Sequence, residues 1–519
     1  MEAIETRKRD VREGRIGAER LLDLVAMLPR QVQVGQQQLE ATVVELRAAR
    51  QRIEELENKL GGSGTAKLDE AYSMRAEEKR QEARGQKKKR PEKRQKKRGR
   101  VPSQDKIAQA ERTEKVFPEA VAESDCHLSH VRPVWRLENG RAVLVAYQID
   151  RGPKSPYGKI PGVLGRSEFG LEIVAEIAFL VYITGLSLDK ACQILTFFQN
   201  VRLGKAQADA LLHPLSRHWE SEFETLCTRL ANSIVVHADE TSWSRNSVWA
   251  FRSEKARVLL FGVHKDAATL QEILDPATFT GIVISDDAAV YANFTHAQKC
   301  WAHLLRKAIK LTLQAPNDVE YRTFTDRLLA IDREACRVQR DRRLGDAGRA
   351  QKVVGLDDQI FDLCADRWCE ELPSFQGLAK DYRLLVHELM RLLLAKELFA
   401  FAIAPPVQQM DGTTHPVDGT NNEAERTLRG AAQARATGRT NKSIDGARRQ
   451  TILTSVLESL RLYLPTFTLT TVLEEMQRWW SAGRSCFQKL QKKLKLVGPE
   501  KPVIDQLFPR PIPSAAPSG

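Results

Sequence analysis

Acidic residues stand at the ends of two apolar segments, and their type and position suit metal-dependent chemistry. Residues 233–241, SIVVHADET, contain Asp239, and residues 281–287, GIVISDD, contain Asp286. Continuous Val/Ile runs favour central strands of an α/β sheet, and ligands bind at the carboxyl ends of such strands. Two neighbouring strands would bring these carboxylates together, and a cation between them would relieve their repulsion. Oxygen ligands favour Mg²⁺ or Mn²⁺, and two such ions can activate an attacking oxygen at phosphorus and stabilise a leaving one.

A third carboxylate is offered by residues 420–430, TNNEAERTLRG. Thr420 and Glu423 have the spacing of a capping box, which predicts the start of a helix and gives Glu423 a structural role. Glu425 lies about 200° further round that helix, so it can point at the sheet edge. Two basic residues of the same helix could contact phosphates: Arg426 and Arg429. This helix alone is explained as well by an ordinary solvated acid/base surface.

The formal net charge is +13, and residues 79–100 carry most of it, with thirteen Lys or Arg against two Glu. Such a block favours a polyanion as partner, and Gly, Pro and Gln leave it extended along a phosphate backbone. The residues expected to contact DNA here are Lys87, Lys88, Lys89, Arg90, Lys93, Arg94, Lys96, Lys97 and Arg98. The alternative is a disordered, solvated linker.

The elements that must position these residues follow from composition and periodicity. The expected fold class is α/β, with a large all-α insertion and a mainly helical N-terminal region that contains a coiled coil. The expected segments are a coiled-coil-like helix at 14–62, a basic linker at 63–104, a small finger-like unit at 105–160, a helical region at 161–231, the first part of the α/β core at 232–303, a helical insertion at 304–412, the C-terminal helices of the core at 413–485 and a tail at 486–519.

Strands are expected at 141–149, 233–241, 247–254, 256–265 and 281–287, with a helix at 267–274. Before the core, residues 188–199 form an expected helix with Ser187 as N-cap, and a second helix follows the break NVRLG. Two short helices around a Gly-containing turn resemble a helix-turn-helix, although a plain packing unit has the same spacing.

Leu39, Leu46, Ile53 and Leu60 recur every seven residues and predict either a short self-associating coiled coil or one amphipathic helix that packs on its own chain. The eight cysteines are scattered without a C-x-x-C pair, as in a reducing compartment. The start lacks an apolar signal region, and the longest apolar stretch, 173–186, is too short for a membrane span. We therefore expect a soluble, cytoplasmic protein without a membrane partner.

Three segments in order resemble the DDE transposases of the insertion-sequence 66 type: HADETSW, ISDDAAVYANFTHAQKCWAHLLRKA and NNEAERTLRG. The N-terminal plan is also similar. The resemblance implies a ribonuclease-H-like core, with Asp239, Asp286 and Glu425 as catalytic residues and ligands of two metal ions. It further implies hydrolysis at transposon ends, joining to target DNA, a homo-oligomer on DNA and possible companion proteins.

The chain departs from the family pattern in several places. The finger-like unit offers only Cys126, His127 and His130, too few ligands for a closed zinc site, so no structural zinc is expected. Asp287 stands where relatives tend to have Gly, and it could replace Asp286 as ligand or raise its pKa. The stretch after the third acid also differs.

Besides Asp287, three further side chains are candidates for supporting roles. Cys300 and His303 form a C-x-x-H at the expected start of a helix, where packing or orientation of the site explains them better than zinc binding. His237 lies on the same strand face as Asp239 and is expected to support it. Three tryptophans are expected in the core: Trp243, Trp249 and Trp301.

Three functions remain open from the sequence. The first is an active transposase, and the second is a metal-dependent nuclease that cuts without strand transfer. The third is a DNA-binding accessory or repressor protein with a lapsed catalytic centre, which would not require Mg²⁺.

Overall fold

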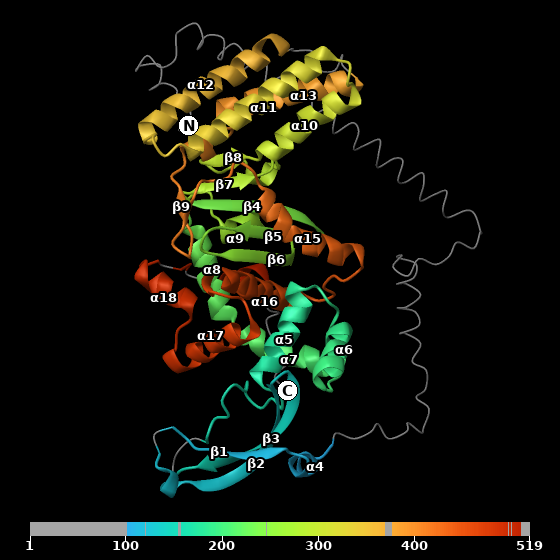
Figure 1. Ribbon diagram of the computed structural model, residues 1–519, viewed down its shortest axis with the longest axis vertical. Coiled ribbons are helices and arrows are strands. Elements are labelled where there is room, and N and C mark those ends of the chain that lie inside the picture. Colours follow the sequence, from blue (N-terminus) through green and yellow to red (C-terminus); the bar gives the residue numbers. More distant parts are fainter. Residues whose placement is uncertain are drawn as a thin grey trace, which may run out of the picture. The chain divides into compact units, whose positions relative to one another are not determined.

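A computed structural model describes residues 101–119, 121–153, 157–244, 246–368, 376–496, 498–499 and 501–509 (Figure 1). The coiled-coil-like helix expected at 14–62 and the nine basic residues between Lys87 and Arg98 lie outside this range. Among the described residues, no helix combines the length and the apolar character needed to cross a membrane.

A three-stranded sheet follows helix α4 (Ser103–Ala108). Its order is β1 (Arg112–Val116), β3 (Arg141–Arg151), β2 (His127–Glu138), with β1 parallel and β2 antiparallel to β3. The strand predicted at 141–149 is therefore confirmed, and it is central because five of its consecutive apolar side chains are buried.

Helices fill the next seventy residues. They are α5 (Leu171–Ala178), the π-helical turn η2 (Phe179–Ile183), α6 (Leu188–Gln199), α7 (Lys205–His218) and α8 (Glu220–Ala231). Ser187 caps α6 as predicted, because its hydroxyl accepts a hydrogen bond from the Lys190 backbone N–H. Asn200 ends α6 in the left-handed conformation. The predicted pair of short helices is confirmed as secondary structure.

A five-stranded sheet forms the α/β core, in the order β6-β5-β4-β7-β8. The strands are β4 (Val235–Trp243), β5 (Asn246–Arg252), β6 (Arg257–Val263), β7 (Ile282–Ser285) and β8 (Ala297–Lys299), and α9 (Ala267–Ile273) connects β6 to β7. β4, β5 and β6 are antiparallel, whereas β7 is parallel to β4 and β8 is parallel to β7. The mixed α/β class and the predicted elements between 233 and 287 are confirmed.

Both faces of this sheet are covered. On one face, Trp249 and Phe251 join the large core that also contains residues of α5, α7 and α8. On the other face, Trp243 and Phe261 pack against Leu428 of α15 (Asn422–Ala436), the helix drawn beside β4 and β5 in Figure 1. This double burial explains why the strands are continuous apolar runs.

Helix α16 (Ile444–Tyr463) runs along the outer edge of β6. Three of its hydroxyls, spaced four residues apart, accept hydrogen bonds from backbone N–H groups of β6. The pairs are Thr451 with Phe261 at 3.0 Å, Ser455 with Leu259 at 2.9 Å and Ser459 with Arg257 at 2.9 Å. At the opposite edge, the Lys299 N–H of β8 donates to the Glu397 carbonyl at 2.8 Å.

The helical character predicted for the insertion is confirmed. Four long helices pack on one another: α10 (Trp301–Gln314), α11 (Val319–Arg340), α12 (Asp346–Cys364) and α13 (Gly377–Ala395). Short elements return the chain to the core: α14 (Ala400–Ile403), β9 (Val407–Gln408) and β10 (Thr414–His415).

Three helices follow α16: α17 (Leu469–Ala482), α18 (Cys486–Lys493) and α19 (Val503–Leu507). Phe487, Val503 and Ile504 are buried in the same core as the sheet. This part of the segment that we expected to be a tail is therefore packed.

Candidate functional site

The two aspartates lie on neighbouring parallel strands. His237 of β4 is paired with Ile284 of β7. Asp239 lies two residues further along β4, and Asp286 directly follows Ser285, the last residue of β7. Asp239 and Asp286 therefore stand at corresponding positions of two parallel strands. The prediction that Asp239 ends its strand is wrong, because β4 continues to Trp243 in antiparallel pairing with β5. Both side chains are half-buried.

The carboxyl of Asp239 is influenced by the charges of three other acids. Its pKa is raised to about 7, first because the carboxyl is buried and then because Glu240, Asp286 and Glu425 repel its negative charge. Burial and like charges both disfavour the ionised form. A cation among these groups would remove the repulsion.

Glu425 reaches the site from the first turn of α15, and this helix is fastened to the sheet by Asn421. The Asn421 side-chain amide donates to the Ala238 carbonyl at 2.8 Å, and its backbone N–H donates to the Cys300 sulfur at 3.1 Å. Asn421 is fully buried. Since Ala238 directly precedes Asp239, this hydrogen bond ties the start of the Glu425 helix to the strand residue next to Asp239.

The predicted capping box is wrong. The N-cap of α15 is Asn421, and its side chain makes no capping hydrogen bond. The Thr420 hydroxyl instead donates to Asp418 at 2.9 Å, and Glu423 forms ion pairs with Arg252 and Arg426. Thr420 and Glu423 have the spacing of a capping box. The Thr420 side chain instead bonds within the turn before the helix, and the Glu423 side chain pairs with nearby arginines.

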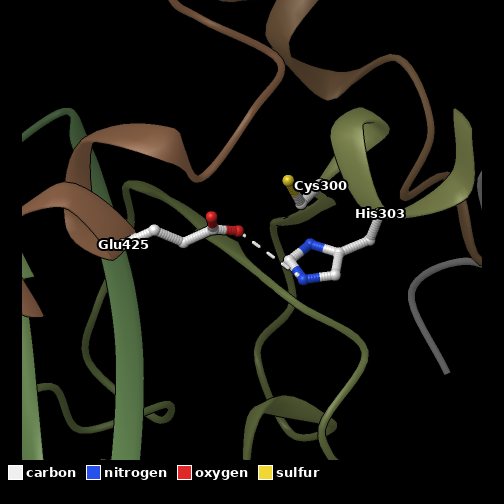
Figure 2. Close-up of side chains that lie close together, drawn as sticks. All are labelled: Cys300, His303 and Glu425. Atoms are coloured by element: carbon white, nitrogen blue, oxygen red, sulfur yellow. Dashed lines mark ion pairs between the residues drawn. The ribbon is translucent and has the colours of Figure 1, made fainter. Parts of the chain in front are cut away.

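Glu425 faces away from these partners. Its carboxylate accepts hydrogen bonds from Arg306 at 3.2 and 3.3 Å and lies 3.6 Å from the Nε2 atom of His303. Figure 2 shows the Glu425 side chain extending toward the His303 ring, with Cys300 beside them. The prediction that Glu423 and Glu425 face different ways is confirmed.

Asp287 is exposed, and its carboxylate forms an ion pair with Arg391 of α13. The carboxylate of Asp286 instead accepts a hydrogen bond from the Ala288 N–H at 3.0 Å. The adjacent acids thus have different partners, and the partner of Asp287 belongs to the insertion.

Glu240 has a role that the sequence did not reveal. Its carboxylate is buried, receives a hydrogen bond from Tyr291 and lies 2.6 Å from the Lys265 ammonium. Since neighbouring residues of a strand face opposite ways, Glu240 lies on the other face from Asp239. In the sequence, the position of Glu240 directly after Asp239, in the run Ala-Asp-Glu, was the signal that could have indicated this role.

His237 is half-buried with a buried Nδ1 atom, and desolvation lowers the pKa of its ring to about 4, so it is neutral near pH 7. Its place on the Asp239 face agrees with the prediction. Trp243, Trp249 and Trp301 are fully buried, which confirms them as core residues.

The remaining candidates lie on α15 and in the N-terminal three-stranded sheet. Arg426 and Arg429 are exposed on α15. Cys126 precedes β2, and the exposed residues His127 and His130 lie on that strand.

Comparison with known families adds one finding to this geometry. Residues 166–383 match the model of the transposase IS66 family. The resemblance is confirmed for this range, which contains Asp239, Asp286, Cys300 and His303, whereas Glu425 lies beyond its end. No curated protein matches the chain. The IS66 match supports a role in transposition, with DNA as the partner.

The chemistry of the three acids suits a divalent ion. Asp239, Asp286 and Glu425 supply only oxygen atoms, the ligands that Mg²⁺ prefers. Their mutual repulsion, seen in the raised pKa of Asp239, is what a bound cation would offset. The donor set therefore fits Mg²⁺ or Mn²⁺.

Proposed function

We propose that the protein is the DNA transposase of an insertion sequence, which cleaves DNA at the element's ends and joins them to target DNA. The observation that carries this proposal is the gathering of Asp239, Asp286 and Glu425 around the carboxyl edge of β4 and β7. The order and direction of the five strands support the ribonuclease-H-like core that the family resemblance implies.

In this proposal the three acids hold two Mg²⁺ or Mn²⁺ ions. When bound, such ions activate an attacking oxygen and stabilise the leaving oxygen at phosphorus. The chain's own contribution is to hold the ligands in position. The pairing of β4 with β7 positions the two aspartates, and the Asn421 hydrogen bond to Ala238 positions the start of α15.

DNA would be held by basic residues around these acids and by the tract at 79–100, with weaker binding at higher salt. A homo-oligomer on paired ends, companion proteins and a cytoplasmic location are parts of the same proposal. The nuclease and the DNA-binding accessory protein remain the alternatives that the experiment must separate.

The test uses labelled DNA carrying the element's terminal repeats, incubated with the full chain and Mg²⁺. We compare Glu425→Gln with Glu423→Gln, a matched control on the same helix whose carboxylate pairs with Arg252 and Arg426. Cleavage and joining should fall to background in the first variant and persist in the second.

The outcomes distinguish the functions. Cleavage followed by joining supports the transposase, and cleavage without joining favours the nuclease. If the unmodified protein gives no Mg²⁺-dependent product but still binds end DNA, the catalytic proposal is rejected in favour of the accessory protein.

A further inference from the structure

A second group of metal-ligating side chains shares Glu425 with the acids. The Cys300 sulfur, a ring nitrogen of His303 and a carboxylate oxygen of Glu425 all lie within 4.8 Å of one another. Figure 2 shows the three side chains converging. From this geometry we propose that Cys300, His303 and Glu425 form a site for a thiophilic divalent ion such as Zn²⁺, which shares Glu425 with the proposed Mg²⁺ site but uses neither aspartate.

The backbone pre-organises these ligands. The Cys300 N–H donates to the Ser285 carbonyl at the end of β7, which places Cys300 at the start of α10 beside the sheet edge. His303 follows within the first turn of that helix, and Glu425 lies in the first turn of α15. Two helix starts, both held to the same sheet, therefore present the ligands without any large movement.

The environment of Cys300 suits a metal-bound thiolate. Its side chain is buried, and its sulfur accepts a hydrogen bond from the Asn421 N–H at 3.1 Å. Backbone N–H donors and a helix N-terminus stabilise a thiolate, which is the form that binds metal. Burial opposes them and raises the pKa of the thiol, so the free protein holds the proton until an ion displaces it.

His303 supplies an independent observation. Its Nδ1 atom is buried and has no hydrogen-bond partner among the described residues. Buried polar atoms are nearly always paired, so an unpaired Nδ1 atom, in a ring whose Nε2 atom lies 3.6 Å from the Glu425 carboxylate, indicates a missing ligand. Sulfur, nitrogen and oxygen together favour Zn²⁺ over Mg²⁺, and three protein ligands leave a fourth position open.

Binding would proceed with a defined proton balance. The Cys300 thiol releases its proton to solvent as its sulfur binds the ion, while His303 binds through a neutral ring nitrogen and Glu425 as a carboxylate. About one proton is therefore released for each ion bound. Because Glu425 is shared, Zn²⁺ should oppose the Mg²⁺-dependent reaction; this consequence rests on the proposed function.

The test titrates Co²⁺, a spectroscopic substitute for Zn²⁺, into the full chain without Mg²⁺. The unmodified protein should bind one equivalent with a thiolate-to-cobalt absorption band, and Zn²⁺ should displace it. The band should be lost in Cys300→Ser and persist in Cys192→Ser, the matched control at a buried cysteine of α6. No band in the unmodified protein, or a band that survives Cys300→Ser, overturns the site.

Two further variants keep the result interpretable. His303→Asn, at a partly exposed position, should lower Co²⁺ affinity at least about tenfold and serves if Cys300→Ser does not fold. Asp239→Asn should keep the cobalt band while Mg²⁺-dependent cleavage is lost, so failure of the proposed function is distinguishable from failure of this site. If Zn²⁺ binds but leaves cleavage by the unmodified protein unchanged, the proposed competition for Glu425 is rejected.

Discussion

Replacing Asp239 with Asn should change how the free energy of unfolding depends on pH, an effect that can be measured without any assay of catalysis. The pKa of this carboxyl is 3.8 in its ordinary state and about 7 in the folded protein. A group whose pKa is raised by folding stabilises the folded state at low pH, and that contribution is lost as the pH rises to about 7. Metal-free protein should therefore become less stable between about pH 4 and pH 7 on account of Asp239.

The size of this effect follows from the shift. About three pKa units correspond to about 4 kcal/mol at roughly 1.4 kcal/mol per unit. The Asp239 side chain is half-buried, so solvent screening reduces the effect, and we expect about 2–3 kcal/mol. Asn keeps the shape of the side chain but cannot ionise, so the variant should lack this part of the pH dependence.

The assay is thermal and urea unfolding of the metal-free chain from pH 5 to pH 8.5, with and without Mg²⁺. Mg²⁺ at about ten times its dissociation constant should restore about 1.4 kcal/mol to the unmodified protein above pH 7, and less at pH 5. Asp239→Asn should lose most of this response.

Asp332→Asn is the control for this experiment. Burial raises the pKa of the Asp332 carboxyl to about 6, but this residue lies on α11. The control should alter the pH dependence and keep the Mg²⁺ response. If Asp239→Asn shows the same pH slope as the unmodified chain, the argument that burial and repulsion prepare this carboxyl for a cation is refuted.

Two other substitutions test the elements that hold the site. Asn421→Ala removes the hydrogen bond to the Ala238 carbonyl and should cost about 1–3 kcal/mol in urea unfolding, with a loss of Mg²⁺-dependent cleavage because α15 is loosened. Ser455→Ala leaves the buried Leu259 N–H unpaired and should cost about 1–3 kcal/mol. Thr454→Val is its matched control, since the Thr454 hydroxyl is buried without a hydrogen-bond partner among the described residues; an equal loss in both variants would contradict a role for the Ser455 bond.

Much of the fold was predictable because the hydrophobic period and the residue composition of a segment depend only on neighbouring residues. Continuous apolar runs indicated the four longer strands of the core, and Ser187 marked a helix start correctly. The strand β8 has only three residues, too few to show a period, and its position depends on pairing with β7. The cap of α15 was predicted wrongly because its two side chains bond to residues outside the four-residue pattern. Thr420 bonds to Asp418, and Glu423 pairs with Arg252 and Arg426.

The candidate site was predictable in its acids and not in what surrounds them. The apolar runs that precede Asp239 and Asp286 indicated these two acids, and the family resemblance indicated Glu425. The contacts of Asn421 and Arg306 join segments more than a hundred residues apart, so no spacing could reveal them. The catalytic roles of Asp239, Asp286 and Glu425 are predictions, which the assay of the Glu425 variant tests.

The hydroxyl groups of α16 have a consequence for how copies of this chain can meet. Strand edges with unpaired backbone groups invite another strand to pair with them. In the five-stranded sheet, Thr451, Ser455 and Ser459 occupy that position along β6, and the backbone at Glu397 contacts β8. The two edges of the five-stranded sheet are thus partly covered by groups of the same chain, which hinders a strand of a second molecule from pairing with β6 or β8.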